Sequence, residues 1–170
     1  MLMKALPVRL SEEEIVRKAS RAGLFLRARP VAEIRRRLAP FWLVEIELSL
    51  NGKRRTALMS VDGLLGTARP ATGPVEFQNV AADGPLACRL SADEAERRAV
   101  QELQRIVLSR SLMAVRDFAL QALPPLIRYY HPIAIIQRTR SDRAEVLDLI
   151  TGYWQRGKYR EVILEADKEA

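Results

Sequence analysis

The sequence contains few residues that could catalyse a reaction or bind a metal ion. It has one cysteine, Cys88, and one histidine, His131. A structural zinc site needs four ligands, and a catalytic cysteine needs a base close to it. Cys88 has no histidine near it in the sequence, so we interpret it as an inert small residue. His131 precedes Pro132 in an apolar stretch, and we expect it to be packed and hydrogen-bonded.

Two aspartates could in principle form a pair of catalytic carboxylates. Each is followed four residues later by a glycine, as Asp62 by Gly66 and Asp148 by Gly152. An aspartate can hold the turn that it opens, and glycine adopts a positive φ at little cost. We therefore expect structural turn motifs, formed by Asp62, Gly66, Asp148, Thr151 and Gly152. The glycines do not form a phosphate-binding loop either. Taken together, these residues indicate no catalytic, cofactor-binding or metal-binding site, and the sequence predicts that the chain is not an enzyme.

Adjacent aromatic residues at Tyr129-Tyr130 and Tyr153-Trp154 could line a ligand surface. Aromatic side chains more often bury their area in a core or an interface, and we favour that interpretation.

The composition is that of a globular protein. Of 170 residues, 48% are hydrophobic and 29% are charged, which suits one compact domain or two small ones. Pro7 interrupts the short apolar start of the chain, and no stretch approaches the roughly 18 apolar residues of a membrane span. We expect a cytoplasmic protein without a membrane span.

The net charge of +7 is concentrated in the first half of the chain. A basic segment followed by a basic hairpin could bind phosphate groups. The candidate anion-binding residues are Arg17, Lys18, Arg21, Arg35, Arg36, Arg37, Lys53, Arg54 and Arg55. A solvated arginine-rich face would have the same sequence, and we favour that interpretation because interleaved aromatic residues are lacking.

Two segments of the chain resemble each other at an offset of 80 residues. Residues 9–19 and 89–99 are identical at six of eleven positions. Both contain Ser-x-x-Glu, the capping box that begins a helix, so helices should start after Ser11 and Ser91. Because the aspartate turns follow in the same order, we predict two related repeats at residues 1–66 and 91–170, joined by residues 67–90. The alternative is that the two repeats form one compact unit.

The first repeat should contain a helix and a hairpin. Alternating apolar residues predict a strand over Phe41–Leu50, and Lys53–Val61 returns as its partner. Asn51-Gly52 between them favours a type I′ turn. Residues 31–38 could form a short second helix that starts behind Pro30.

The second repeat should follow the same plan. The apolar residues at helical spacing could continue its helix as far as Leu123, and Pro124 would end the helix there. Leu126–Arg138 and Arg143–Leu149 are the expected strands, and Tyr159–Glu165 fits either a strand or a short helix. The predicted fold class is α+β, with two α-β-β repeats whose helices pack on antiparallel sheet.

This order of elements resembles the PepSY domain, a small cystatin-like α+β module. Asp148-Leu149-Ile150-Thr151-Gly152 matches the Asp-x-x-Thr-Gly motif of that family, whereas Asp62-Gly63-Leu64-Leu65-Gly66 lacks the threonine. PepSY modules are typically exported and have been proposed to restrain peptidases or to act as interaction domains. The resemblance implies a non-enzymatic binding or regulatory module.

We therefore predict a protein–protein interaction or regulatory module without a cofactor. Its partner would be another protein or a second copy of the chain, because exposed strand edges make a homodimer plausible. The alternative is a protein that binds nucleic acid or an anionic surface through the basic residues named above.

Overall fold

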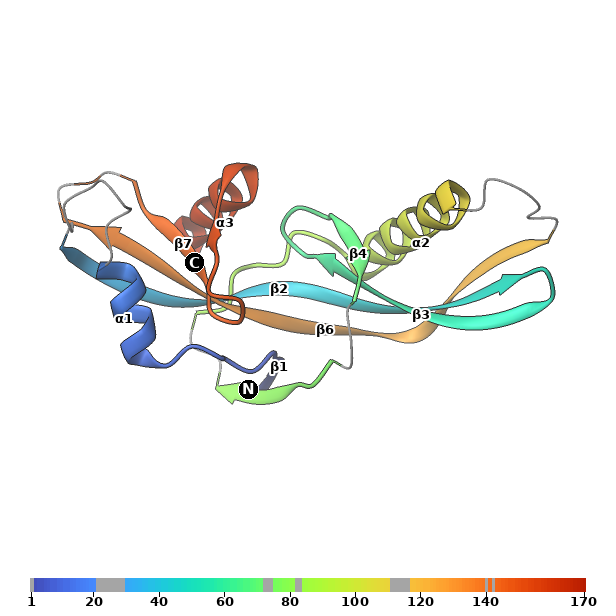
Figure 1. Ribbon diagram of the computed structural model, residues 1–170, viewed down its shortest axis with the longest axis horizontal. Coiled ribbons are helices and arrows are strands. Elements are labelled where there is room, and N and C mark those ends of the chain that lie inside the picture. The colour runs from blue at the N-terminus through green and yellow to red at the C-terminus, as the bar shows by residue number, and fades with distance from the viewer. Residues whose placement is uncertain are drawn as a thin grey trace. The chain divides into compact units, whose positions relative to one another are not determined.

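A computed structural model of the chain describes residues 2–20, 30–71, 75–81, 84–110, 117–139, 141 and 143–170 (Figure 1). These residues form three helices and eight strands. In chain order the elements are β1 (Leu2–Ala5), α1 (Glu12–Ser20), β2 (Val31–Leu50), β3 (Lys53–Asp62), β4 (Ala68–Pro70), β5 (Gln78–Ala81), α2 (Ala92–Arg110), β6 (Phe118–Arg138), β7 (Glu145–Asp148), β8 (Trp154–Gln155) and α3 (Gly157–Glu169).

Two long strands, β2 and β6, are neighbours in a mixed sheet. The hydrogen-bonded order is β4-β3-β2-β6-β1-β5, and β7 pairs with both β6 and β8. The chain divides into two compact units, and each long strand contributes residues to both of them. Unit 1 contains Met1–Ala39, Glu76–Ala87 and Tyr130–Ala170, and unit 2 contains Pro40–Val75 and Cys88–Tyr129.

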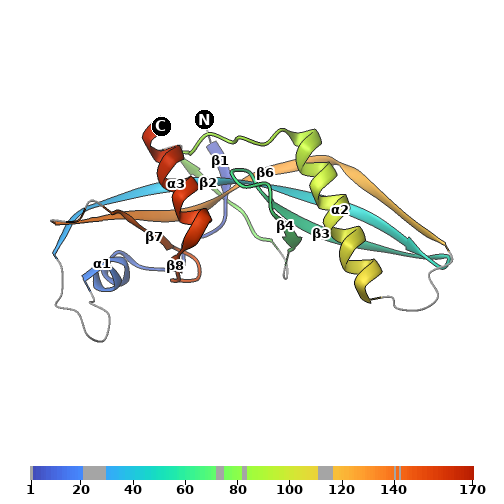
Figure 2. The same ribbon diagram turned by 90° about the horizontal axis from the view of Figure 1, so that it is seen from above.

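In unit 2, α2 packs across the hairpin of β2 and β3 (Figure 2). The hairpin pairs residues from Phe41–Asp62 at its base to Leu50–Lys53 at its tip. Asn51 and Gly52 have φ values of 49° and 76°, which confirms the type I′ turn. Alternation brings one face of each strand under the helix. The buried core residues are Trp42, Val44, Ile46, Met59, Val61, Leu90, Ala95, Ala99 and Leu103.

Unit 1 contains α1, α3 and the hairpin of β6 and β7. Ile15 and Ala19 of α1 are buried in one core with residues of that hairpin, which are Ala134, Ile136, Leu147 and Leu149. Ile163 and Ala166 of α3 are also buried. The N-terminal strand β1 pairs with β5 in antiparallel fashion and with β6 at Ala5.

The predicted fold class, two α-β-β repeats whose helices pack on antiparallel sheet, is wrong. The chain is α+β, but its strands join in one mixed sheet. The packing of α1 and α2 is exchanged, since each of them packs on the hairpin from the other half of the sequence. Helix α1 packs on β6 and β7 of the second half, whereas α2 packs on β2 and β3 of the first half. An amphipathic pattern shows which face of a helix is buried but not which hairpin it meets. The repeat boundaries at residues 66 and 91 stay a prediction, and each unit contains residues from both halves.

Two predicted helical segments are strands instead. Residues 31–38 belong to β2, where Arg35 and Arg37 lie on one face by strand alternation. Helix α2 has the bounds Ala92–Arg110, and residues 111–116 of its expected continuation lie outside the described residues. Residues 118–123, at the end of that continuation, belong to β6. The residues of this segment that pack on the core of unit 2, such as Leu120 and Ala122, follow the period of a strand. Residues 159–165 lie in α3.

Candidate functional site

Asp62 organises a tight turn in unit 2. Its carboxylate is buried, and Oδ1 accepts the backbone N–H groups of Leu64 at 2.7 Å and Leu65 at 2.9 Å. The N–H of Gly66 donates to the carbonyl oxygen of Asp62 at 2.8 Å, and Gly66 has a φ of 71°. One carboxylate oxygen is thus engaged by the turn rather than directed at a ligand.

Asp148 organises the same turn in unit 1. Its Oδ1 accepts the N–H groups of Ile150 at 2.8 Å and Thr151 at 3.0 Å, and the N–H of Gly152 donates to its carbonyl oxygen at 2.9 Å. The other oxygen, Oδ2, lies 3.0 Å from Nε2 of His131. Burial alone would raise the pKa of Asp148, but the imidazole and the two N–H groups outweigh it and lower the pKa to about 2.

A basic side chain from a helix lies on the glycine of each turn. In unit 2 it is Arg98 of α2, and a Cβ at Gly66 would lie 2.9 Å from its Nε. In unit 1 it is Lys18 of α1, whose Nζ donates to the carbonyl oxygen of Gly152 at 3.2 Å. Glycine adopts the positive φ of these two positions without strain and leaves room for the basic side chain. In unit 1 the hydrogen bond from Lys18 ties α1 to the turn, whereas in unit 2 Arg98 packs on the turn.

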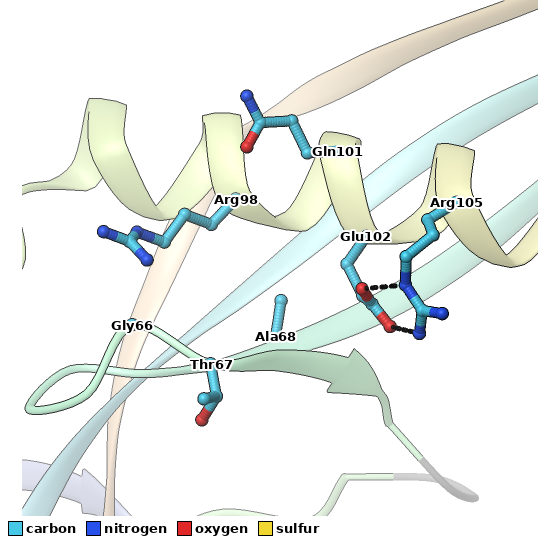
Figure 3. Close-up of a pocket in the computed structure, with 7 residues that line it drawn as sticks. All are labelled: Gly66, Thr67, Ala68, Arg98, Gln101, Glu102 and Arg105. Carbon is cyan, nitrogen blue, oxygen red and sulfur yellow. Dashed lines mark hydrogen bonds and ion pairs between the residues drawn. The ribbon is translucent and has the colours of Figure 1, made fainter.

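Unit 2 has an open groove between the Asp62 turn and α2, with a volume of about 350 Å³ (Figure 3). Its floor is the chain from the turn into β4, and its wall is one face of α2. The lining residues are Gly66, Thr67, Ala68, Arg98, Gln101, Glu102 and Arg105. The four helix residues are spaced i, i+3, i+4 and i+7, as one face of a helix requires. That spacing is visible in the sequence, but the prediction of function did not use it.

Ion pairs along the helix hold both arginines of the groove. Nε and Nη2 of Arg98 contact Oε1 of Glu94 at 3.2 and 2.8 Å. Arg105 makes a two-fold contact with Glu102, from Nε to Oε2 at 2.8 Å and from Nη2 to Oε1 at 2.6 Å. This hydrogen bonding lowers the pKa of Glu102 and raises that of Arg105, so both stay charged at neutral pH.

Strand β4 lies at the edge of the sheet beside this groove. Among the described strands it pairs only with β3. The N–H of Asp62 donates to the carbonyl oxygen of Thr67 at 2.9 Å, and the N–H of Ala71 donates to that of Leu58 at 2.8 Å. Because hydrogen bonding alternates along an antiparallel pair, the N–H and C=O of Ala68 point away from β3.

The predicted anion-binding residues are divided between the two units. In unit 1, Arg35 and Arg37 both contact the nearly buried carboxylate of Asp167 in α3, at 2.9 and 2.5 Å. Arg36 contacts Glu12, and Arg17 lies 3.7 Å from Glu14. These contacts neutralise much of the basic segment.

The remaining predicted basic residues include the hairpin tip of unit 2. Lys53, Arg54 and Arg55 are exposed there, and Arg54 lies 3.8 Å from Glu47. Arg21 is outside the described residues.

The other candidate chemical residues do not come together in one unit. Cys88 and Asp62 belong to unit 2, whereas Asp148 and His131 belong to unit 1. Cys88 Sγ lies 3.3 Å from the carbonyl oxygen of Leu90. Within the part of the chain that the structure describes, no three His, Cys, Asp or Glu residues are grouped so that they could hold a metal ion.

The aromatic candidates have different surroundings. Tyr129 is buried, and its hydroxyl lies 2.7 Å from Oγ of Ser60. Trp154 is half-buried and packs on the core that contains Ile15 and Ala19 of α1, whereas Tyr153 is 73% exposed.

No protein-family model, curated protein or solved structure matches the chain. The resemblance to PepSY domains thus stays a prediction. None of the helices described is long and apolar enough to cross a membrane.

Proposed function

We propose that the chain is a non-enzymatic protein-binding module that holds an extended segment of its partner in the groove between β4 and α2. The observation that carries this proposal is the outer edge of β4, where Ala68 directs its N–H and C=O away from β3. An extended peptide can add to such an edge through main-chain hydrogen bonds, while a neighbouring helix face selects its side chains.

Two longer strand edges are less suited to such pairing. Along residues 118–128, β6 has β2 as its one neighbour among the described strands. Pro124 and Pro125 have no N–H, and because successive residues face opposite sides of a strand, one of them interrupts this edge. Along residues 31–37, the edge of β2 carries Glu33 and three arginines. Prolines and charges of this kind protect edges from pairing. Strand β4 also ends in a proline, Pro70, so its outer edge offers the N–H of Ala68 and the C=O groups of Ala68 and Pro70. The protection of the two longer edges favours a different protein at β4 over a homodimer formed by these edges.

The two aspartate turns support a non-enzymatic role. A general acid or base must reach the proton that it transfers. Asp62 and Asp148 each give one oxygen to two backbone N–H groups, and Asp148 directs the other toward His131. A cytoplasmic location remains part of the proposal, as the sequence predicts.

The proposal can be tested with the full chain and a library of random peptides displayed on phage. We expect peptides to be selected and to lose roughly 2- to 10-fold in affinity with Ala68→Pro, which removes one outward N–H. N-methylation should weaken a selected peptide at alternate residues, because only every second N–H faces a neighbouring strand. A library that yields no binder, or binding that N-methylation leaves unchanged at every position, would overturn the proposal.

A second candidate function is binding of nucleic acid or another anionic surface by the hairpin tip. It is favoured by three consecutive exposed cations, Lys53, Arg54 and Arg55. If all three contact phosphates, affinity for duplex DNA should fall roughly 40-fold between 50 and 200 mM salt. Replacing all three with serine should abolish DNA binding and leave peptide binding unchanged. Ala68→Pro should weaken peptide binding and leave DNA binding unchanged, so each of the two variants is a control for the other function.

A further inference from the structure

We propose that the segment bound in the groove is acidic, and that a carboxylate side chain of the partner contacts Arg98 and Arg105. This inference rests on the proposed function and specifies the partner of the same site. It follows from the hydrogen-bonding groups of the groove, from the spacing of its two arginines and from the charge of the chain.

The groove offers more donors than acceptors. An arginine has five N–H donors and no acceptor, and the pairs with Glu94 and Glu102 use Nε and Nη2 of each arginine. The Nη1 groups are outside these pairs, whereas both carboxylate oxygens of Glu102 are inside them. A ligand for this surface must therefore supply acceptors, and a carboxylate supplies about four lone-pair sites.

The spacing of the arginines suits an extended peptide. Arg98 and Arg105 are seven positions apart in α2, which corresponds to about 10 Å along the helix axis. An extended chain covers that length in about three residues, the length of β4. One acidic residue at the centre, or two acidic residues separated by one, could then reach both guanidinium groups.

The existing ion pairs do not oppose such a ligand strongly. The side chain of Arg105 is 70% exposed and that of Arg98 is 46% exposed. Exposed ion pairs contribute little to stability, so the arginines can reorient toward a ligand at small cost. A net charge of +7 also attracts acidic segments at a distance.

The test uses peptides selected from the same random library on the full chain. We expect Asp or Glu to be enriched at one or two positions of the selected peptides. Replacing that acid by its amide should reduce affinity about 10-fold or more, as should Arg105→Gln, because a hydrogen bond to a charged group is lost. With the amide peptide, Arg105→Gln should have little further effect. Arg97→Gln is the matched control, since Arg97 is exposed on α2 and does not line the groove.

The outcomes separate this inference from the proposed function. Selected peptides without acidic enrichment, or an amide peptide that binds as well as the acid, would overturn the inference and leave the function in place. A library without binders would overturn the function itself. If a short DNA duplex displaced the peptide and its own binding needed Arg105, the groove would bind phosphates, and the acidic-peptide proposal would be wrong.

Discussion

The exchanged packing of the helices predicts where a mutation in α1 acts. Ile15 is 1% exposed and belongs to the core that contains Ile136 and Leu147. Ile15→Ala should therefore destabilise the hairpin of β6 and β7, more than 100 residues away in sequence. A chain with each helix on its own hairpin would instead lose stability in β2 and β3.

The size of the effect follows from the carbons removed. Ile15→Ala deletes three buried carbons, each contributing about 0.8 kcal/mol, and it leaves a cavity that adds to the loss. Helix α1 has nine residues and only one other buried side chain, Ala19, so little can compensate. We expect unit 1 to lose about 3 kcal/mol, which corresponds to roughly 100-fold faster exchange of its protected amides.

Hydrogen exchange measured by mass spectrometry on peptic fragments can locate this loss. Fragments that contain residues 133–149 should exchange faster in Ile15→Ala, and those that contain residues 42–61 should change less. Leu103→Ala is the matched control, because Leu103 of α2 is buried against β2 and β3. It should give the opposite pattern.

A double-mutant cycle removes the ambiguity that would arise if both units unfolded together. Ile15→Val combined with Leu147→Ala should show coupling, because both residues belong to one core. Ile15→Val combined with Met59→Ala should be additive within about 0.5 kcal/mol. Coupling to Met59 and not to Leu147 would refute the exchanged packing.

Three further predictions concern single contacts. The pKa of Asp148 is about 2 in the folded protein against an ordinary 3.8, so its contribution to stability is present above the ordinary pKa and is lost as the pH falls through about 2. Denaturation at a series of pH values should show a loss of about 2 kcal/mol, and Asp148→Asn should remove that pH dependence. Gly152→Ala should lower the melting temperature more than Gly157→Ala, because both glycines have positive φ but only Gly152 lies against Lys18. In a chain that also carries Lys18→Ala, the difference between the two melting temperatures should be smaller. Asp167→Asn should weaken the hold of α3 on β2 by about 1–3 kcal/mol and expose α3 to proteolysis, whereas Glu161→Gln on the same helix should not.

The local signals in the sequence predicted several elements well. Both capping boxes begin helices, with the N–H of Glu14 donating to Oγ of Ser11 and that of Glu94 to Oγ of Ser91, each at 3.2 Å. The strand of Phe41–Leu50 and the turn at Asn51 are confirmed as well. These features depend on interactions between residues close in sequence, which a single chain reveals directly.

The pairing of distant segments could not be predicted in this way. Residues 31–38 carry apolar side chains at positions that suit a helix or a strand, and their place in β2 depends on the neighbouring β6. The choice of hairpin for each helix likewise depends on contacts between residues distant in sequence. Groove residues such as Gln101 have the spacing of one helix face, but only β4 beside them makes that face the wall of a site.

The comparison of the two aspartate turns separates structural residues from residues available for binding. Each turn has an aspartate that accepts hydrogen bonds from its backbone and a glycine on which a basic side chain of a helix packs. The two turns differ at the residue after the glycine. Thr67 lines the groove in unit 2, whereas Tyr153 is exposed in unit 1. Substitutions of the shared aspartates and glycines should reduce stability, whereas substitutions of Arg105 and Gln101 should change binding at unchanged stability. This difference in response would distinguish a binding groove from a surface hollow.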